Sequence, residues 1–591
     1  MGSGIFGLGT RAMSAAQVNL DTISHNISNV NTPGYSRQTV QLETEGGLYT
    51  GAGFFGRGVK VTTIARQTNE FLIKENNQNQ AMASADQTRL EKLNQLEKVL
   101  PTGETGLGYA ASQLLNAFVD VSNQPQDISA RQVVLSRAKE WVSRVNTAAD
   151  QLNQMQLGVV SDMTTSVARI NSLTQQIAKA NQSIASFSGI GHAPNDLLDQ
   201  RDQLVQDLNK LVQVNTVEAD DGSLNVFMGG GQLLVLSNSA ETLAVVRDPA
   251  DSTLARVALR TNGNDRILES DQMVGGALKG LLSFQDTDIA QTRSNLDTFV
   301  QQFADAVNQQ QSLGVDMEGT PQTTFDATGN PVGKPIFLNT TSAANISLAL
   351  NQPKGLAAAS PLTAAVLPSN QGTMAIESLA MNRALPGPGA LDYGSSLPTN
   401  GQPLTVIFEQ PNPSDPTLTY RFVDQSGVPY KDVTPARVWS AGTPISDADA
   451  GSTPPEALFM VNVTGVPRAG DKITVALTQN PSANNGNARA MLKLRDQAII
   501  SLDGSTHATV TDAYSQMIGD LGVLVQDGKT SAGISATLAQ TSQQTLSSAT
   551  GVNLDEEAAK LIQFQQSYQA AAKVLQIAQS LFDTLLQTAR G

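Results

Sequence analysis

The two ends of the chain carry the same apolar pattern. Near each terminus, apolar residues recur at alternating spacings of three and four. The C-terminal members are Leu561, Phe564, Tyr568, Ala571, Leu575, Ala578, Phe582 and Leu585. The N-terminal members are Met13, Ala16, Leu20, Ile23, Ile27 and Val30. This spacing places one narrow apolar stripe along a helix, as in a coiled coil. We call both sets together the terminal seam, and we expect its halves to pair with each other or with other copies.

Composition argues against several classes of function. The net charge is −15 without any basic stripe, so we expect no nucleic-acid partner and no attachment to a membrane surface. The sequence has no run of 18 or more apolar residues, so we expect no transmembrane helix. With no cysteine and three histidines, the sequence argues against zinc and thiol chemistry. These counts leave a Ser/Asp catalytic arrangement open, but no nucleophile-elbow sequence appears. We therefore expect no metal site, no cofactor, no catalytic residues and no small-molecule substrate.

The first 30 residues lack the basic start, apolar core and cleavage site of a secretory signal. We therefore expect any export to leave the N-terminus uncleaved. The terminal seam alone offers little apolar surface to offset the entropy of ordering two helices. We expect the termini to be disordered in the free monomer and to fold on assembly.

The first helix should end near Asn31. Pro33 lacks a backbone N–H and disfavours helical geometry at Thr32, and Gly34 then permits a turn. The following stretch, to about residue 64, is rich in glycine and threonine and is expected to be extended.

Long helices should dominate up to about residue 213. Apolar spacing predicts one continuous helix over about 130–187, with an inserted step of four that locally unwinds its supercoil. Such a helix would be ~85 Å long, which suits a rod. The next helix places Arg201 among its apolar residues, where it would need a partner carboxylate. The last helix should be capped by Asn553.

The sequence predicts strands in two other regions. Apolar residues alternate with a period of two within 214–275, and a region rich in proline and glycine with short β-type runs covers about 320–485. The fold class is therefore multidomain α+β, with discontinuous terminal coiled-coil helices, a long helical-bundle rod and inserted β-rich outer domains. The expected domains are a terminal coiled coil, a helical rod, a small hairpin region and an outer insertion. Their boundaries are, in that order, 1–45 plus 545–591; 46–213 plus 280–320 plus 486–544; 214–279; and 321–485.

One segment resembles a known family. Residues 19–38, NLDTISHNISNVNTPGYSRQ, are similar to the N-terminal motif of bacterial flagellar axial proteins. Its ending resembles the version in hook-associated protein 1, the hook–filament junction family. The blocks DLLDQRD at 196–202, NVFMGGG at 225–231 and NLDEE at 553–557 resemble the same family. We name as the axial motif Asn29, Asn31, Thr32, Pro33, Gly34, Tyr35, Ser36, Arg37 and Gln38.

The resemblance implies a structural subunit that self-assembles through its terminal helices and joins hook to filament. It implies a ring of copies that contacts the hook protein and the second hook-associated junction protein. It also implies a cytoplasmic export chaperone on the C-terminal helix, export by the flagellar type III apparatus, and a final place in the extracellular flagellum. It implies no enzymatic activity.

Two alternatives stay open at this point. The chain could be another axial protein, such as hook or distal-rod protein, although these normally lack the long pattern at 130–187. It could also be an axial scaffold that carries an enzymatic insertion at 321–485, although that region contains no histidine and no metal-type cluster.

Overall fold

A computed structural model describes residues 2–590, except 51–52, 188–193, 262, 321, 326–330, 382–401, 413, 431–436 and 448–456. The described residues form two compact units, each built from separate stretches of sequence. The first comprises Met1–Gln95, Met155–Ile289 and Leu524–Gly591, and the second Leu96–Gln154 and Ala290–Val523. The long helices α5 (Ile128–Phe187) and α10 (Val510–Thr550) each contribute to both.

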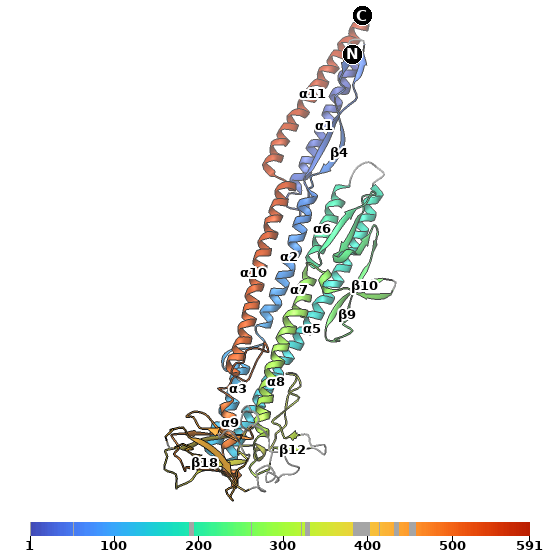
Figure 1. Ribbon diagram of the computed structural model, residues 1–591. Coiled ribbons are helices and arrows are strands. Elements are labelled where there is room, and N and C mark those ends of the chain that lie inside the picture. The colour runs from blue at the N-terminus through green and yellow to red at the C-terminus, as the bar shows by residue number, and fades with distance from the viewer. Residues whose placement is uncertain are drawn as a thin grey trace. The chain divides into compact units, whose positions relative to one another are not determined.

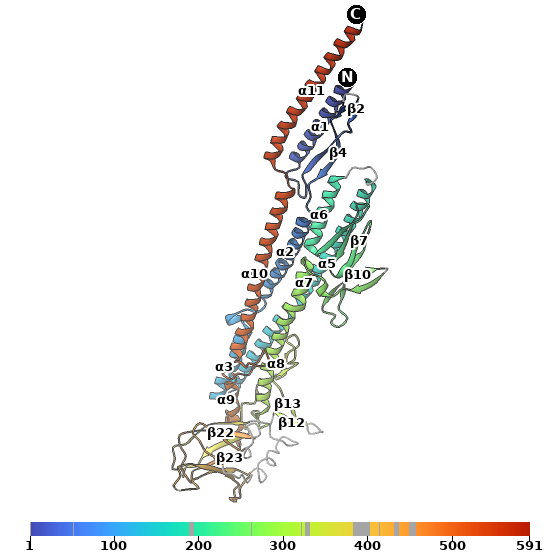
Figure 2. The ribbon, with the colours of Figure 1, turned by 45° about the horizontal axis from the view of Figure 1, so that its top comes forward.

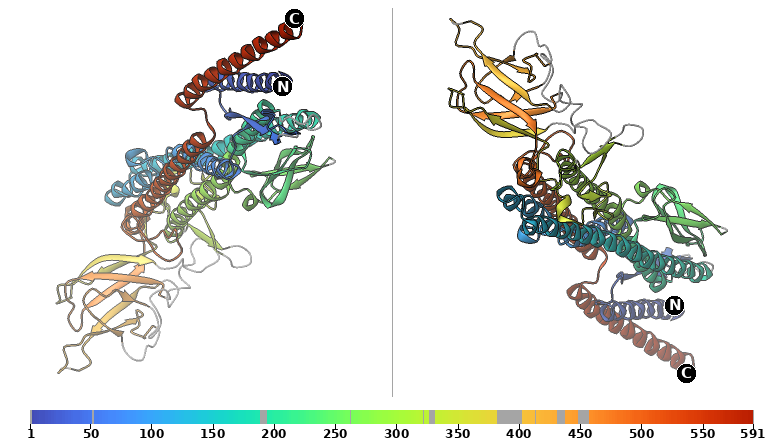
Figure 3. Two further views of the ribbon diagram at one scale, coloured as in Figure 1. Left: turned by 90° about the horizontal axis from the view of Figure 1, so that it is seen from above. Right: turned by 90° about the horizontal axis from the view of Figure 1, so that it is seen from below.

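The two ends of the chain form an antiparallel helix pair in the first unit. Helices α1 (Gly2–Ser28) and α11 (Leu554–Arg590) lie side by side in all views (Figures 1, 2 and 3). They approach closely at Gly9, where an added Cβ would lie 2.8 Å from Leu575 Cδ2. Helix α11 has 37 residues and α1 has 27, so the C-terminal end of α11 extends beyond the start of α1.

Extended chain follows α1, as expected. The strands are β1 (Gln38–Thr44), β2 (Leu48–Thr50), β3 (Gly53–Phe55) and β4 (Val59–Arg66). Strand β1 pairs antiparallel with β4, with a bulge between Gln41 and Leu42, and β2 pairs with β3. Both β1 and β4 contact α1, so the β1–β4 ribbon covers a part of α1 that α11 leaves open.

The rest of the first unit combines helices with two antiparallel sheets. Its helices are α2 (Glu70–Leu96), the later part of α5, α6 (Asn195–Leu211), α7 (Ala277–Ser283), the π-helix η5 (Phe284–Ile289) and the later part of α10. One sheet has the order β5-β6-β7-β8 and the other β11-β10-β9. Their strands are β5 (Val214–Glu218), β6 (Leu224–Met228), β7 (Gln232–Leu236), β8 (Ser239–Ala240), β9 (Thr242–Arg247), β10 (Ala255–Thr261) and β11 (Asn264–Ile267).

The second unit has a helical part with an aromatic core. Its helices are α3 (Leu107–Asn116), α4 (Phe118–Asn123), the first part of α5, α8 (Ala290–Ser312), α9 (Gly486–Lys493) and the first part of α10. Trp141 is fully buried, with its ring 4.7 Å from Phe303 and 5.1 Å from Phe337 between centroids. Such tilted aromatic contacts add to the stabilisation from apolar burial.

The insertion in the second unit is built from short strands. These are β12 (Thr323–Phe325), β13 (Pro331–Gly333), β14 (Phe337–Leu338), β15 (Ser347–Leu348), β16 (Leu362–Val366), β17 (Ala375–Met381), β18 (Leu404–Glu409), β19 (Thr419–Val423), β20 (Arg437–Val438), β21 (Ile445–Ser446), β22 (Phe459–Thr464) and β23 (Lys472–Leu477). A five-stranded sheet of order β16-β23-β18-β19-β20 and a three-stranded sheet of order β17-β22-β21 share one apolar core. That core includes Phe408, Phe422 and Phe459.

Several local predictions are confirmed. The helix expected over about 130–187 is the single 60-residue helix α5. The first helix ends at Ser28, ahead of Pro33, and Asn553 Oδ1 accepts the backbone N–H of Asp555 at 3.0 Å as the cap of α11. The fold class is confirmed, with 27- and 37-residue terminal helices and several antiparallel sheets. The four-part domain division stays a prediction, and the two compact units group the helices differently.

Arg201 has two partners, a backbone carbonyl that it bonds directly and a more distant carboxylate. Its Nη1 donates to the backbone carbonyl of Gly222 at 2.7 Å, whereas its nearest carboxylate oxygen, on Asp202, is 3.9 Å from Nε. Burial lowers the pKa of Arg201, although Asp202 and Glu218 oppose that effect. The turn carbonyl of Gly222 is therefore the direct hydrogen-bond partner of Arg201, and Asp202 is a longer ion-pair partner.

Candidate assembly site

The terminal seam is only partly covered within one chain. Its buried members are Ala16, Ile23, Ala571 and Ala578. Its half-buried members are Met13, Leu20, Ile27, Val30, Leu561, Phe564, Tyr568 and Leu575. Phe582 is 49% exposed, and the side chain of Leu585 lies outside the described residues. The seam thus brings α1 and α11 together through small residues, while most of its large side chains keep an open flank.

Helix α11 also has a second apolar face beside the seam. Ile562, Val574, Ile577 and Leu581 are 56%, 38%, 52% and 52% exposed. Val574, Ile577 and Leu581 each directly precede a seam residue, so these three side chains form a stripe about 100° around the helix from the seam. Ile562 directly follows Leu561 and lies on the other flank of the seam. Helix α1 leaves each of these four side chains at least 38% exposed.

The axial motif begins with a turn in which position 34 favours glycine. Asn29 Oδ1 accepts the hydroxyl of Thr32 at 3.1 Å, which holds the chain as it leaves α1. Gly34 has φ +78°, and an added Cβ would lie 2.7 Å from Gln203 Oε1 on α6. Asn31, Thr32, Pro33 and Gly34 are exposed, so this part of the motif shapes the backbone rather than packing in the core.

Behind the turn lies a buried polar network that we call the clasp: Asn26, Arg37, Gln38 and Glu557. Asn26 is 1% exposed, and both of its amide atoms are fully engaged. Its Nδ2 donates to Gln38 O and to Glu557 Oε2, both at 2.9 Å. Its Oδ1 accepts the Tyr35 hydroxyl at 2.7 Å and the Gln38 N–H at 3.0 Å. The network joins α1, the axial motif and the first turn of α11.

Arg37 is the charged centre of the clasp. Its Nε lies 2.8 Å and its Nη2 2.6 Å from Glu557 Oε1, and its Nη1 donates to Glu556 Oε2 at 2.8 Å. The Glu557 side chain is 1% exposed, whereas that of Glu556 is 57% exposed. The backbone N–H of Arg37 also donates to Thr550 O at 2.9 Å, so the motif reaches the connection between α10 and α11.

A second set of contacts ties the axial motif to α6. Ser36 N–H donates to Asp199 Oδ2 at 3.0 Å, and Gln38 Nε2 donates to Asp196 Oδ1 at 3.2 Å. Arg66, at the end of β4, donates from Nη1 to Asp199 Oδ1 at 3.0 Å and to Asp202 Oδ2 at 2.6 Å. The three sequence blocks at 19–38, 196–202 and 553–557 therefore meet in one place.

The protonation behaviour of these groups follows from burial and pairing. Burial alone would lower the pKa of Arg37, but its hydrogen bonds and charge interactions with Glu556 and Glu557 raise it overall. Burial raises the pKa of Asp199, against the hydrogen bonds from Ser36 and Arg66. Burial, with the charges of Asp196, Asp199 and Glu557, raises the pKa of Tyr35. Tyr35 therefore remains a hydroxyl donor to Asn26 throughout the physiological range.

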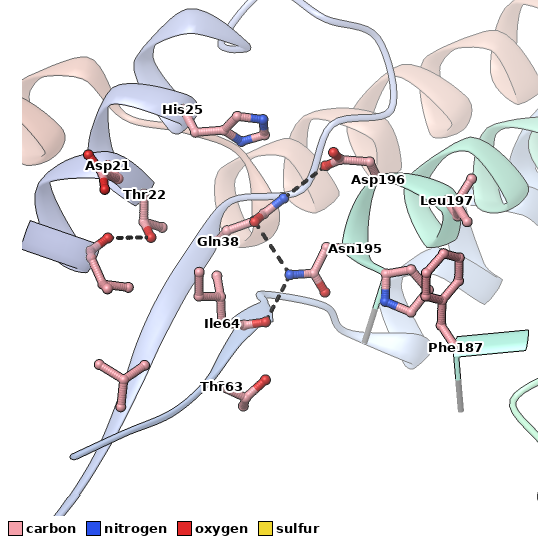
Figure 4. A pocket seen from close by; sticks show the side chains of 13 residues that line it. Asp21, Thr22, His25, Gln38, Thr63, Ile64, Phe187, Asn195, Asp196 and Leu197 are labelled. Carbon is pink, nitrogen blue, oxygen red and sulfur yellow. Dashed lines mark hydrogen bonds between the residues drawn. The ribbon is translucent and has the colours of Figure 1, made fainter. Parts of the chain in front are cut away.

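A groove borders this network on the side of β4 and α6 (Figure 4). It has a volume of about 780 Å³ and is lined by parts of α1, β1, β4, the end of α5 and the start of α6. Asn195 donates from Nδ2 to Ile64 O at 2.9 Å, while its Oδ1 has no hydrogen-bond partner among the described residues. His25 lines the groove and is exposed.

Sequence reasoning missed several members of the site. Asn26 and Glu557 stood out only as members of the resembling blocks at 19–38 and 553–557, and neither was predicted to have a partner. Asn195 and Arg66 carried no signal at all. The sequence did offer one hint. Asp199 and Glu557 each lie in a block that resembles the family, and their partners Ser36 and Asn26 lie in the block at 19–38.

No helix within the described ranges is long and apolar enough to span a membrane. In the same ranges, no three carboxylate or imidazole side chains are grouped to hold a metal ion.

Comparison with known proteins identifies the family. Residues 93–326 match the model for the flagellar hook-associated protein FlgK helical domain. Residues 8–35 match the model for the flagella basal body rod protein, and 542–588 that for the flagellar basal body rod FlgEFG protein C-terminal. Flagellar hook-associated protein 1 of Salmonella typhimurium is 30% identical over 97% of this chain and 98% of its own length. This chain belongs to the flagellar hook-associated protein 1 family.

Further relatives agree with this assignment. Flagellar hook-associated protein 1 of Escherichia coli is 29% identical over 97% of each chain. The solved structure of the flagellar hook junction protein FlgK from Burkholderia pseudomallei matches with a TM-score of 0.63, over 80% of this chain and 99% of that one. At 24% identity, this last likeness supports the fold alone. As a member of the hook-associated protein 1 family, with rod-protein motifs at both ends, the chain is a structural protein of the flagellar axis.

Proposed function

We propose that the chain joins the flagellar hook to the filament as a ring of copies that assemble through α1 and α11. The observation that carries this proposal is the uncovered apolar surface of α11. Its exposed side chains Ile562, Val574, Ile577 and Leu581 adjoin a seam that α1 covers only in part. Neighbouring copies that cover these four half-exposed side chains would gain roughly 3–6 kcal/mol per helix, at about 1.5–3 kcal/mol for a fully buried side chain.

The clasp gives the terminal pair a fixed base. Asn26, Arg37 and Glu557 bond the start of α11 to the end of α1, and Ser36 and Arg66 bond the axial motif and β4 to α6. No comparable polar network joins α1 to α11 at their other end among the described residues. We therefore restrict the expectation of disordered termini: the base of the pair should be ordered in the free monomer, and only the Phe582 end should become ordered on assembly.

The proposed neighbours are other copies of the chain, the hook protein and the second hook-associated junction protein. We propose export through the flagellar type III apparatus, with a cytoplasmic chaperone on the exposed stripe of α11 until assembly. The final location would be the extracellular flagellum. The role needs no cofactor and no enzymatic step, and the relatives are structural flagellar proteins. In the insertion, the described strands pack around an apolar core that includes Phe408 and Phe459.

The test replaces two side chains of the uncovered stripe by Ile577→Gln and Leu581→Gln in one chain. Electron microscopy of cells that express only this variant should show hooks without filaments, with flagellin lost to the medium. The matched control is Val217→Gln with Leu236→Gln, which changes two side chains of similar exposure, 56% and 52%, on the sheet β5-β6-β7-β8. Normal filaments with the α11 variant would overturn the proposal, and so would equal loss with the control.

A further inference from the structure

The groove beside the clasp offers hydrogen-bond acceptors that lack partners. Asp21 is exposed at its edge and has no hydrogen-bond or ion-pair partner in the described part of the chain. Asn195 is 8% exposed, and its Oδ1 is unpartnered. Asp196 accepts one bond, from Gln38. Among the groove's lining residues there is no lysine or arginine, while Val18, Val61 and Phe187 add apolar surface. The groove therefore suits a cationic donor that adjoins apolar side chains.

The other end of α1 carries a surface of that kind. Arg11 Nε donates to the backbone carbonyl of Arg57 at 2.8 Å, which brings two guanidinium-bearing residues together beside the β3–β4 turn. Neither guanidinium group has a carboxylate partner among the described residues. On the same helix Ile5 and Leu8 are 43% and 41% exposed, and Leu8 lies beside Gly58, the neighbour of Arg57 in sequence. We call Ile5, Leu8, Arg11 and Arg57 the basic end.

We propose that the groove of one copy receives the basic end of a neighbouring copy of this chain. This inference rests on the proposed function and names the contact between copies. Guanidinium groups would reach Asp21 and the free Asn195 Oδ1, and Ile5 and Leu8 would cover Val18 and Phe187. Bonds from arginine to carboxylate are among the stronger polar contacts at interfaces.

The two surfaces cannot satisfy each other within one chain. Arg11 and Asp21 are ten residues apart on α1, which is ~15 Å along the helix. A contact between different patches is heterologous, and its repetition from copy to copy generates a ring or a helical row. Both arrangements suit a component of the flagellar axis.

The absence of cysteine permits a direct test. We would introduce Asp21→Cys and Arg57→Cys together, isolate intact flagella, oxidise them mildly and separate the chains without reductant. A head-to-tail contact should give a ladder of covalent oligomers, because each copy bonds to two neighbours. Either single variant should give no ladder, since one cysteine can link two copies at most. Arg11, whose Nε bonds to the Arg57 carbonyl, lies ~15 Å along α1 from Asp21, and a disulfide formed within one chain would give no ladder.

A ladder that both single variants lack would support the proposal. Only monomers, only dimers, or bonds to another flagellar protein in the double variant would overturn it. If such flagella retained normal filaments, the proposed junction function would stand while this contact failed. The two failures are therefore distinguishable.

Charge reversal supplies a second measurement. Asp21→Arg alone and Arg57→Asp alone should each reduce incorporation into flagella by about tenfold, because an attractive pair becomes repulsive. The two changes in one chain should restore incorporation to within about twofold. Asp220→Arg, an exposed reversal on the turn after β5, is the control and should have no effect. Failure of the double reversal to restore incorporation would overturn the proposal.

Discussion

Removal of the Glu557 carboxylate should loosen the base of the terminal pair far more than removal of its neighbour. In Glu557→Ala, Arg37 keeps only its contact with Glu556, and Asn26 Nδ2 loses its bond to Glu557. Removal of one partner of a buried ion pair costs about 3–5 kcal/mol. Because Glu556 still neutralises part of the charge on Arg37, we expect the lower end of that range, about 3 kcal/mol.

Glu556→Ala is the matched control. It removes the same chemical group from the same arginine, one residue earlier on α11. Since the Glu556 side chain is 57% exposed, its pair should contribute about 0–1 kcal/mol. The two variants should therefore differ by about 2 kcal/mol or more, which is a ratio of roughly 30 in a local opening equilibrium.

The assay is hydrogen exchange on the full-length monomer. The backbone N–H of Arg37 donates to Thr550 O at 2.9 Å, and that of Gln67 donates to Arg37 O at 2.7 Å, so both amides report on opening of the clasp. Protection at these amides should fall roughly 30-fold further in Glu557→Ala than in Glu556→Ala. Equal protection in the two variants, within about twofold, would refute the argument that burial makes Glu557 the critical partner.

Three other predictions concern single positions. Gly34→Ala should destabilise the first unit by about 1–2 kcal/mol in urea unfolding, because φ is +78° there, and no loss would contradict this. Gly519→Ala should stabilise α10 by up to about 1 kcal/mol, because the added Cβ meets open space, whereas Gly528→Ala would press within 2.8 Å of buried Leu93 and should not stabilise. Asp471 accepts three backbone N–H groups of the insertion, and although burial opposes them, they lower its pKa. The ionised carboxylate therefore stabilises the folded insertion above the ordinary Asp pKa, and this stabilisation is lost as pH falls through the lower folded pKa. Amide protection in the insertion should fall below about pH 4, and it should fall less in Asp471→Asn.

Local features of the fold could be predicted because they depend on short-range physics. The period of 3.6 residues per turn fixes where a stripe lies, so α5 and both terminal helices were predictable from spacing. Pro33 and Asn553 mark helix boundaries through a missing donor and a capping acceptor. None of these inferences requires knowledge of a partner.

The clasp could not be predicted in the same way. Asn26 and Glu557 are 531 positions apart, and nothing in either local sequence selects the other. The strand order β16-β23-β18 in the insertion likewise depends on pairing over more than a hundred residues, for example Ala364 with Val475. The direct hydrogen-bond partner of Arg201 is a carbonyl in a turn, and side-chain charge gives no guide to such an acceptor.

The apolar seam and the polar clasp have different tasks in the terminal pair. A 3–4 alternation repeats every seven residues, so α11 could slide by seven along α1 and still face it with apolar side chains. Such a slide shifts Glu557 along the helix by ~10.5 Å, away from Asn26, and breaks the ion pair between Arg37 and Glu557. Because an unpaired buried charge costs about 3–5 kcal/mol, the clasp selects one alignment from several that the seam accepts. Glu557→Ala should therefore leave both helices able to form while it reduces incorporation into flagella, since the proposed contacts between copies need every pair in the same register.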